Sequence, residues 1–124
     1  MSIDISQLNK AQKQAVTHDQ GPAILIAGAG TGKTTVITQR IAHLIEQGKA
    51  TPEEILAVTF TEKAAGEMAE RIDQLLPLGY SDLWIHTFHG FCERILKDYS
   101  IDIGLPNDFK LFDNTAAWLL VRQN

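Results

Sequence analysis

The sequence has almost none of the residues from which disulfide frameworks and zinc sites are built. It holds one cysteine, Cys92, so no disulfide can form within the chain and a cysteine-rich metal site is excluded. Four histidines are present, but no two of them form a close i,i+4 pair with a carboxylate between them. We therefore do not expect a zinc site.

An excess of positive charge is also missing. The 11 lysines and arginines stand against 15 aspartates and glutamates, which gives a net charge of −4 at neutral pH. A surface that neutralises phosphates needs the opposite sign. If this chain contacts nucleic acid, local geometry must provide the contact, or the basic surface lies outside the chain.

Long apolar runs are absent too. No stretch approaches the roughly 18 consecutive apolar residues of a membrane-spanning helix. The N-terminal residues Met1 to Asp4 lack the basic and apolar regions of a signal peptide. We therefore expect no membrane partner and a cytoplasmic, reducing location. The 124 residues, 44% of them hydrophobic, fit one globular domain or a piece of a larger one.

What the sequence does contain is an alternation of strand and helix patterns. Short apolar runs predict buried strands at 23–27, 55–60 and 83–86. Capping residues and apolar stripes predict helices at about 9–18, 33–47, 61–75 and 87–99, a capped turn at 51–54, and a last helix from Asp113 or Asn114. Loops are predicted at 77–82 and 104–107. This order predicts an α/β fold with a parallel sheet flanked by helices. Because the last helix is still in register near the final residue, we expect the sequence to be a piece of a longer protein.

A glycine-rich turn between the first strand and the second helix is the most specific signal. Glycines let backbone N–H groups wrap phosphates, and the helix N-terminus adds the positive end of a dipole. Lys33 can reach the β- and γ-phosphates of a nucleotide, and the Thr34 hydroxyl can ligate Mg²⁺. The turn reads Ala27-Gly28-Ala29-Gly30-Thr31-Gly32-Lys33-Thr34.

This turn departs from the strict phosphate-loop pattern at Ala27, where that pattern has glycine. Alanine is tolerated there if its φ is negative. The alternative interpretation is a flexible turn that binds nothing. A dinucleotide-binding turn is disfavoured, because Lys33 and Thr34 follow the glycines directly. The turn does not reveal how the nucleotide is used, because kinases, GTPases and motors share it.

Four segments occur in an order and spacing that together are highly specific. The chain resembles superfamily-one DNA helicases of the UvrD/PcrA/Rep group over nearly its whole length, and the RecB and AddA nucleases have related segments. The resemblance implies a partial RecA-like P-loop NTPase domain over residues 1–104 and the start of an inserted helical subdomain over 105–124. The four segments are Leu8 to Gln12, Ala27 to Thr34, Ile55 to Met68 and Ile85 to Cys92.

By that resemblance the nucleotide is ATP with Mg²⁺, and several further residues lie close to it. Gln12 belongs to the segment that reads the adenine edge, where an amide offers a donor and an acceptor together. The alternative for Gln12 is a capping box with Asn9, and both roles can hold. Thr35 stands where many relatives have an arginine near the adenine. Arg40 is present as in the family and is counted with the nucleotide site; its alternative is a solvent-exposed helix arginine.

The resemblance also implies two segments that contact single-stranded DNA, each where a strand ends and a helix begins. In the first, Phe60 can stack a base or belong to the core, and Thr61 can bind phosphate or cap the helix. Glu62 departs from the asparagine of close relatives, and Lys63 or a backbone N–H would have to offset its charge. In the second, His89 can contact DNA or cap a helix. The predicted DNA-binding residues are Thr59, Phe60, Thr61, Lys63, Thr87, Phe88 and His89.

Other parts of the family's catalytic machinery are missing from the sequence. No Asp-Glu pair follows an apolar strand, and the arginines that stabilise the transition state belong to later segments. The resemblance therefore implies an ATP-dependent helicase or translocase on single-stranded DNA, moving 3′ to 5′ and serving DNA repair or replication, completed by further helicase domains of the same protein. We expect this chain alone neither to hydrolyse ATP efficiently nor to unwind DNA.

Two other functions stay open on the phosphate loop alone. A small-molecule kinase would need a phosphoacceptor pocket and an arginine-rich lid, and the sequence shows neither. A nucleotide-sensing domain would bind ATP without hydrolysing it. Stimulation of ATP hydrolysis by single-stranded DNA separates a DNA motor from both.

Overall fold

The computed structural model describes residues 4–76, 83–106 and 108–123. The contacts within the chain divide it into an N-terminal unit, Met1–Phe91, and a C-terminal unit, Cys92–Asn124. The predicted loop at 77–82 lies outside the described residues. Among the residues that are described, no helix is both long and apolar enough to cross a membrane.

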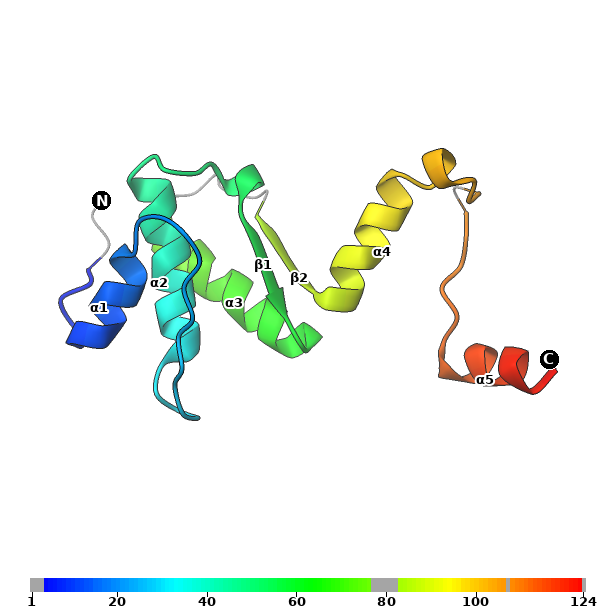
Figure 1. Ribbon diagram of the computed structural model, residues 1–124, viewed down its shortest axis with the longest axis horizontal. Coiled ribbons are helices and arrows are strands. Elements are labelled where there is room, and N and C mark those ends of the chain that lie inside the picture. Colours follow the sequence, from blue (N-terminus) through cyan, green and yellow to red (C-terminus); the bar gives the residue numbers. More distant parts are fainter. Residues whose placement is uncertain (1–3, 77–82, 107, 124) are drawn as a thin grey trace. The chain divides into compact units, whose positions relative to one another are not determined.

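The N-terminal unit contains a two-stranded parallel sheet. Strand β1 (Leu56–Thr59) pairs with β2 (Trp84–Thr87), with Leu56 opposite Trp84 and Thr59 opposite Thr87, and helix α3 (Glu62–Leu75) connects the two strands (Figure 1). A parallel pair joined by a crossover helix is the unit that the alternating pattern predicted. Three further elements precede β1: α1 (Lys10–Thr17), α2 (Lys33–Glu46) and the short 3₁₀ turn η1 (Pro52–Glu54).

The core of this unit lies where α2 and α3 pack against one face of the sheet. The apolar residues of each helix recur four residues apart and so form one stripe, as Ile41 with Ile45 and Met68 with Ile72 do. Ile72 has no exposed surface, and Ala57 contributes the strand side of the cluster. The remaining buried members are Ala42 and Leu76, with Ile55, Leu75, Leu83 and Ile85 packed around them.

Local capping signals place the helix ends where the sequence predicts them. Asn9 and Gln12 form a capping box at the start of α1: the Asn9 side chain accepts from the Gln12 backbone N–H, the Gln12 side chain accepts from the Asn9 backbone N–H, and both bonds measure 2.9 Å. Gly48 follows the end of α2, and its φ of 64° is a left-handed conformation that favours glycine. The Lys49 N–H then donates to the carbonyl of Leu44 at 2.9 Å, which closes the last turn.

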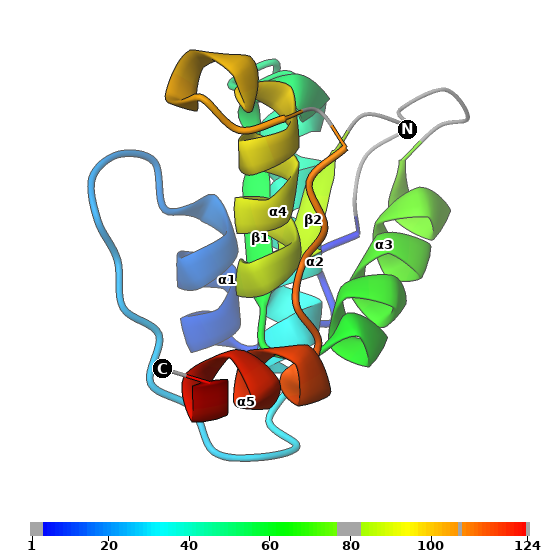
Figure 2. The ribbon, with the colours of Figure 1, turned by 90° about the vertical axis from the view of Figure 1, so that its right-hand side faces the viewer.

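The predicted strand at 23–27 is wrong. Ile24 and Ile26 are 90% and 94% exposed, and the segment lies in the long connection between α1 and α2 (Figure 2). In the described part of the chain the sheet consists of β1 and β2. A strand needs a neighbour to accept its ladder hydrogen bonds, and a run of apolar residues does not supply one.

Helix α4 (Phe88–Asp98) begins directly after β2, and the division between the two units falls within this helix. A 3₁₀ turn, η2 (Ile101–Ile103), follows, and Gly104 breaks the chain with φ of 75°. Helix α5 (Asn114–Gln123) begins after Asp113, whose carboxylate accepts from the Ala116 N–H at 2.7 Å. The last helix therefore begins as predicted. The contacts within the chain divide it between Phe91 and Cys92. The domain boundary expected between 104 and 105 stays a prediction.

Candidate nucleotide-binding loop and nucleic-acid edge

The glycine-rich turn before α2 has the backbone that its sequence requires. Gly30 and Gly32 have φ of 74° and 85°, values that glycine adopts without strain. Among the described residues only glycines have positive φ, so Ala27 and Ala29 stand where alanine is allowed. Alanine at position 27, where the strict phosphate-loop pattern has glycine, is therefore compatible with this backbone.

Lys33, the first residue of α2, bends back over this turn. Its ammonium donates to the carbonyls of Ala27 at 3.0 Å and Gly28 at 2.5 Å. The Thr31 hydroxyl also donates to the Gly28 carbonyl, at 2.8 Å. A lysine held in this way lies among the backbone groups of the loop and can exchange its carbonyl partners for phosphate oxygens.

Gln12 joins α1 to the same loop. Its Nε2 donates to the Thr31 carbonyl at 3.1 Å, while its Oε1 accepts from the Asn9 backbone N–H. Gln12 lines a cavity of about 340 Å³ together with Gly28, Thr31 and Lys33. The capping box is confirmed, and the amide lies at the loop at the same time. Its contact with adenine stays a prediction.

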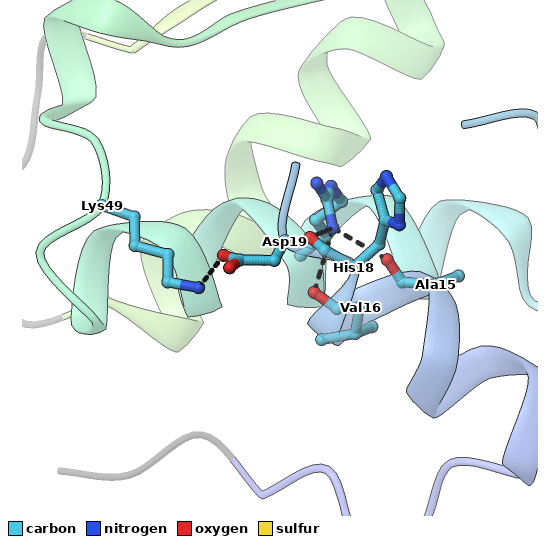
Figure 3. Close-up of polar contacts among 6 residues, drawn as sticks. Ala15, Val16, His18, Asp19 and Lys49 are labelled. Carbon is cyan, nitrogen blue, oxygen red and sulfur yellow. Dashed lines mark hydrogen bonds and ion pairs between the residues drawn. The ribbon is translucent and has the colours of Figure 1, made fainter. Parts of the chain in front are cut away.

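The structure places Arg40 in a role that neither interpretation of the sequence foresaw. Its Nη1 donates to three carbonyls at the end of α1: Ala15 at 3.0 Å, Val16 at 3.2 Å and His18 at 2.6 Å (Figure 3). The side chain is half-buried, so the solvent-exposed interpretation is wrong, and its hydrogen bonds go to a helix end rather than to the phosphate loop. A contact between residues so distant in the sequence has no local signal.

The two threonines that follow Lys33 lie in the first turn of α2. Thr34 is half-buried and Thr35 is exposed. The Thr34 hydroxyl offers one oxygen to a hard cation such as Mg²⁺, which binds proteins through few ligands and keeps water and phosphate oxygens for the rest. This donor chemistry fits Mg²⁺ held jointly with a nucleotide.

The two predicted DNA segments meet at the carboxyl ends of β1 and β2. Thr59 and Thr87 are register partners there. Just beyond them, the Phe60 and Phe88 rings have centroids 5.6 Å apart at an interplanar angle of 57°. Phe60 is 91% exposed and Phe88 is half exposed, so the interpretation of Phe60 as a core residue is wrong. An exposed aromatic pair at the end of parallel strands offers faces on which bases can stack.

One hydrogen-bond chain ties these two turns together. The buried Thr87 hydroxyl donates to Glu62 Oε1 at 2.7 Å and accepts from the Gly90 N–H at 3.0 Å. The Thr87 side chain therefore serves the protein and caps α4. Glu62 accepts a hydrogen bond from this hydroxyl but keeps its charge, and the Lys63 ammonium lies 3.8 Å from Glu67. Sequence reasoning missed this partner because it looked only at neighbours along the chain.

Some of the other residues predicted at this edge use their side chains for hydrogen bonds within the protein, and others are exposed. Thr61 caps α3, since its hydroxyl accepts from the Ala64 N–H at 3.2 Å. The Thr59 hydroxyl donates to the Thr61 carbonyl at 3.0 Å. Lys63, three residues after Phe60, and His89, directly after Phe88, are both exposed. Their contacts with DNA stay predictions.

Comparison with known proteins identifies the family. Residues 8–124 match the sequence model of the UvrD/REP helicase N-terminal domain. The chain belongs to this family. Membership confirms the resemblance drawn from the four segments.

Curated relatives of the UvrD/REP family agree with this assignment. The ATP-dependent DNA helicase PcrA of Bacillus subtilis is 48% identical over 117 residues, which cover 94% of this chain and 16% of the relative. DNA helicase II of Escherichia coli is 42% identical over 123 residues, covering 99% and 17%. A probable DNA helicase II homolog of Mycoplasma pneumoniae is 50% identical over 119 residues, covering 90% and 17%. The chain thus spans about a sixth of the length of these relatives.

Proposed function

We propose that the protein to which this chain belongs is an ATP-dependent helicase or translocase that moves 3′ to 5′ on single-stranded DNA in repair or replication. The chain would form the front of its first RecA-like motor domain. The observation that supports this most is that one folded unit holds both a phosphate loop closed over Lys33 and an exposed pair of phenylalanines at the strand ends. Family membership and the names of the relatives point the same way.

On the nucleotide side, the Lys33 ammonium would leave the Ala27 and Gly28 carbonyls for the β- and γ-phosphates. Backbone N–H groups at the start of α2 would receive the same phosphates. The Thr34 hydroxyl would hold Mg²⁺, which neutralises charge on the phosphates when bound. The Gln12 amide is held by two hydrogen bonds, one at its oxygen and one at its nitrogen. The second N–H of the amide would donate to the adenine edge.

On the DNA side, bases would stack on Phe60 and Phe88, while Lys63 and His89 would contact phosphates. Stacking suits this chain because its net charge of −4 gives it little general attraction for phosphates. Helix α3 begins at this edge and packs on α2, which begins at the phosphate loop. When this domain and a second motor domain close around ATP, the movement would therefore be transmitted to the DNA edge through two packed helices.

The test is steady-state ATP hydrolysis by the full-length protein, with and without single-stranded DNA. We expect strong stimulation by DNA that Lys33→Ala abolishes. Lys97→Ala is the matched control, because that lysine pairs with Glu93 on an exposed face of α4 at 2.6 Å. Turnover that ignores DNA would contradict the motor and favour the kinase. Nucleotide binding without turnover would favour the sensor.

A further inference from the structure

Helix α1 is attached to the nucleotide loop at its N-terminal end. The Gln12 amide donates to the Thr31 carbonyl at 3.1 Å. The fit is close: a Cβ at Gly32 would lie 3.1 Å from Gln12 Nε2, so a side chain at position 32 would displace the amide slightly. Gln12 can therefore serve the loop only while α1 holds its present position.

The opposite end of α1 is attached to α2 by the Arg40 side chain. Three of these carbonyls, at Ala15, Val16 and His18, accept from Arg40 Nη1. The last turn of a helix leaves its carbonyls without partners and presents the negative end of the helix dipole. A half-buried guanidinium satisfies both needs, so this contact fixes where α1 ends.

Arg40 also lies at a fixed distance from the phosphate loop. It stands two helical turns after Lys33 on the same face of α2, because seven residues bring a helix back to nearly the same direction. The connections form a closed circuit: loop to α2, Arg40 to the end of α1, and Gln12 from the start of α1 back to the loop. Val16, which has no exposed surface, fills the space between the helices.

We infer that Arg40 is a positioning residue for recognition of the nucleotide base, acting through α1 to hold the Gln12 amide at the loop. This inference rests on the proposed use of ATP. Loss of Arg40 would free the end of α1 and let Gln12 drift from the base. The phosphate contacts would stay, because Lys33 and the start of α2 do not depend on α1.

A neighbouring ion pair supplies a matched control. Lys49 pairs with Asp19 just beyond α1, with side chains 42% and 62% exposed (Figure 3). The hydrogen bond from Lys49 holds the pKa of the Asp19 carboxyl below its usual range, so the pair is charged at neutral pH. Lys49→Met removes one positive charge near the end of α1, as Arg40→Met does, without touching the carbonyls of α1. Exposed ion pairs of this kind contribute little to the free energy of unfolding.

The experiment measures equilibrium binding of ATP and of GTP, each with Mg²⁺, to the full-length protein. We expect Arg40→Met to lower the preference for ATP over GTP about tenfold, the factor for one lost hydrogen bond of about 1.4 kcal/mol, with GTP affinity nearly unchanged. Gln12→Ala should do the same, and the double variant should lose no more than Gln12→Ala alone. Arg40→Lys should keep part of the preference, and Lys49→Met all of it.

Equal weakening of ATP and GTP by Arg40→Met, or an unchanged preference, would overturn the inference. If Arg40→Met fails to fold, Arg40→Lys decides: a smaller ATP preference than in the wild type supports the inference, and an equal one overturns it. A failure of the proposed function can be told apart from a failure of this inference. It would show as a wild-type protein without ATP preference, or as binding that Lys33→Ala leaves intact.

Discussion

Gly32 stands where the phosphate loop becomes α2, and its backbone is one that other residues adopt at a cost. Its φ is 85°, and an added Cβ would lie 3.1 Å from Gln12 Nε2. Gly28 has no positive φ, and a Cβ there would meet Thr31 at an ordinary 3.6 Å. We predict that Gly32→Ala lowers the free energy of unfolding by roughly 1–2 kcal/mol, while Gly28→Ala changes it far less. Urea unfolding followed by circular dichroism measures both, and equal effects would contradict the prediction.

Glu62 combines a structural bond with an unfavourable charge. Its carboxylate accepts from the Thr87 hydroxyl, yet it lies beside the proposed DNA path. Glu62→Gln keeps an acceptor oxygen and removes the charge. We predict that it tightens binding of a thymidine oligonucleotide by up to about fivefold at low salt, the factor for about 1 kcal/mol between charges 4 Å apart in water. Fluorescence anisotropy measures the change, which should fade as salt rises.

Two controls separate the charge of Glu62 from its hydrogen bond. Glu62→Ala removes both, so we expect a lower unfolding free energy by about 1 kcal/mol, which Glu62→Gln should not show. Glu70→Gln removes the same charge two turns further along α3, away from the strand ends, and should change DNA affinity less. Weaker DNA binding by Glu62→Gln would count against a DNA path at this edge.

At the scale of elements, two strand-to-helix turns form one surface because parallel strands end side by side. The rings of Phe60 and Phe88 meet there, one from each turn. We predict that Phe60→Ala or Phe88→Ala weakens single-stranded DNA binding about fivefold or more, since stacking contributes roughly 1–3 kcal/mol per base. Stability should change little for Phe60→Ala, because that ring is 91% exposed.

The matched control for this surface is Phe112→Ala. Phe112 is 62% exposed and belongs to the C-terminal unit, so its loss removes an exposed phenylalanine that is not part of the Phe60–Phe88 pair. Equal losses of affinity for Phe60→Ala and Phe112→Ala would show that exposed aromatic surface in general, rather than this pair, binds the DNA. The same anisotropy titration compares the three variants.

At the scale of the whole molecule, the proposed nucleotide loop stands without the acidic pair that the family uses to activate water. The sequence has no Asp-Glu pair after an apolar strand and spans about a sixth of its relatives. We predict that the 124-residue chain alone shows no DNA-stimulated ATP hydrolysis in a coupled assay, although it retains the Lys33 loop. Rapid turnover by the isolated chain would contradict this and would require a water-activating group within it.

Most helix ends could be predicted because their hydrogen bonds are local. The Asn9–Gln12 box, the Thr61 cap and the Asp113 cap each join residues three apart, so the residue types reveal them directly. The glycines of the phosphate loop are of the same kind, because positive φ is a property of one residue. The parallel order of β1 and β2 also followed from the sequence, since a crossover helix between two strands leaves few alternatives.

The amino-acid sequence alone was enough to predict the family, the glycine-rich turn before α2, the helix caps and the two strand-to-helix turns after β1 and β2. Three features became visible only in the folded chain: 23–27 is not a strand, Arg40 donates to the carbonyls at the end of α1, and Glu62 accepts from Thr87. The Arg40–Ala15 and Glu62–Thr87 contacts each join residues 25 positions apart, and the strand requires a neighbour elsewhere in the chain. Such partners are brought together by packing, and the residue types at either position do not specify which distant group will lie opposite.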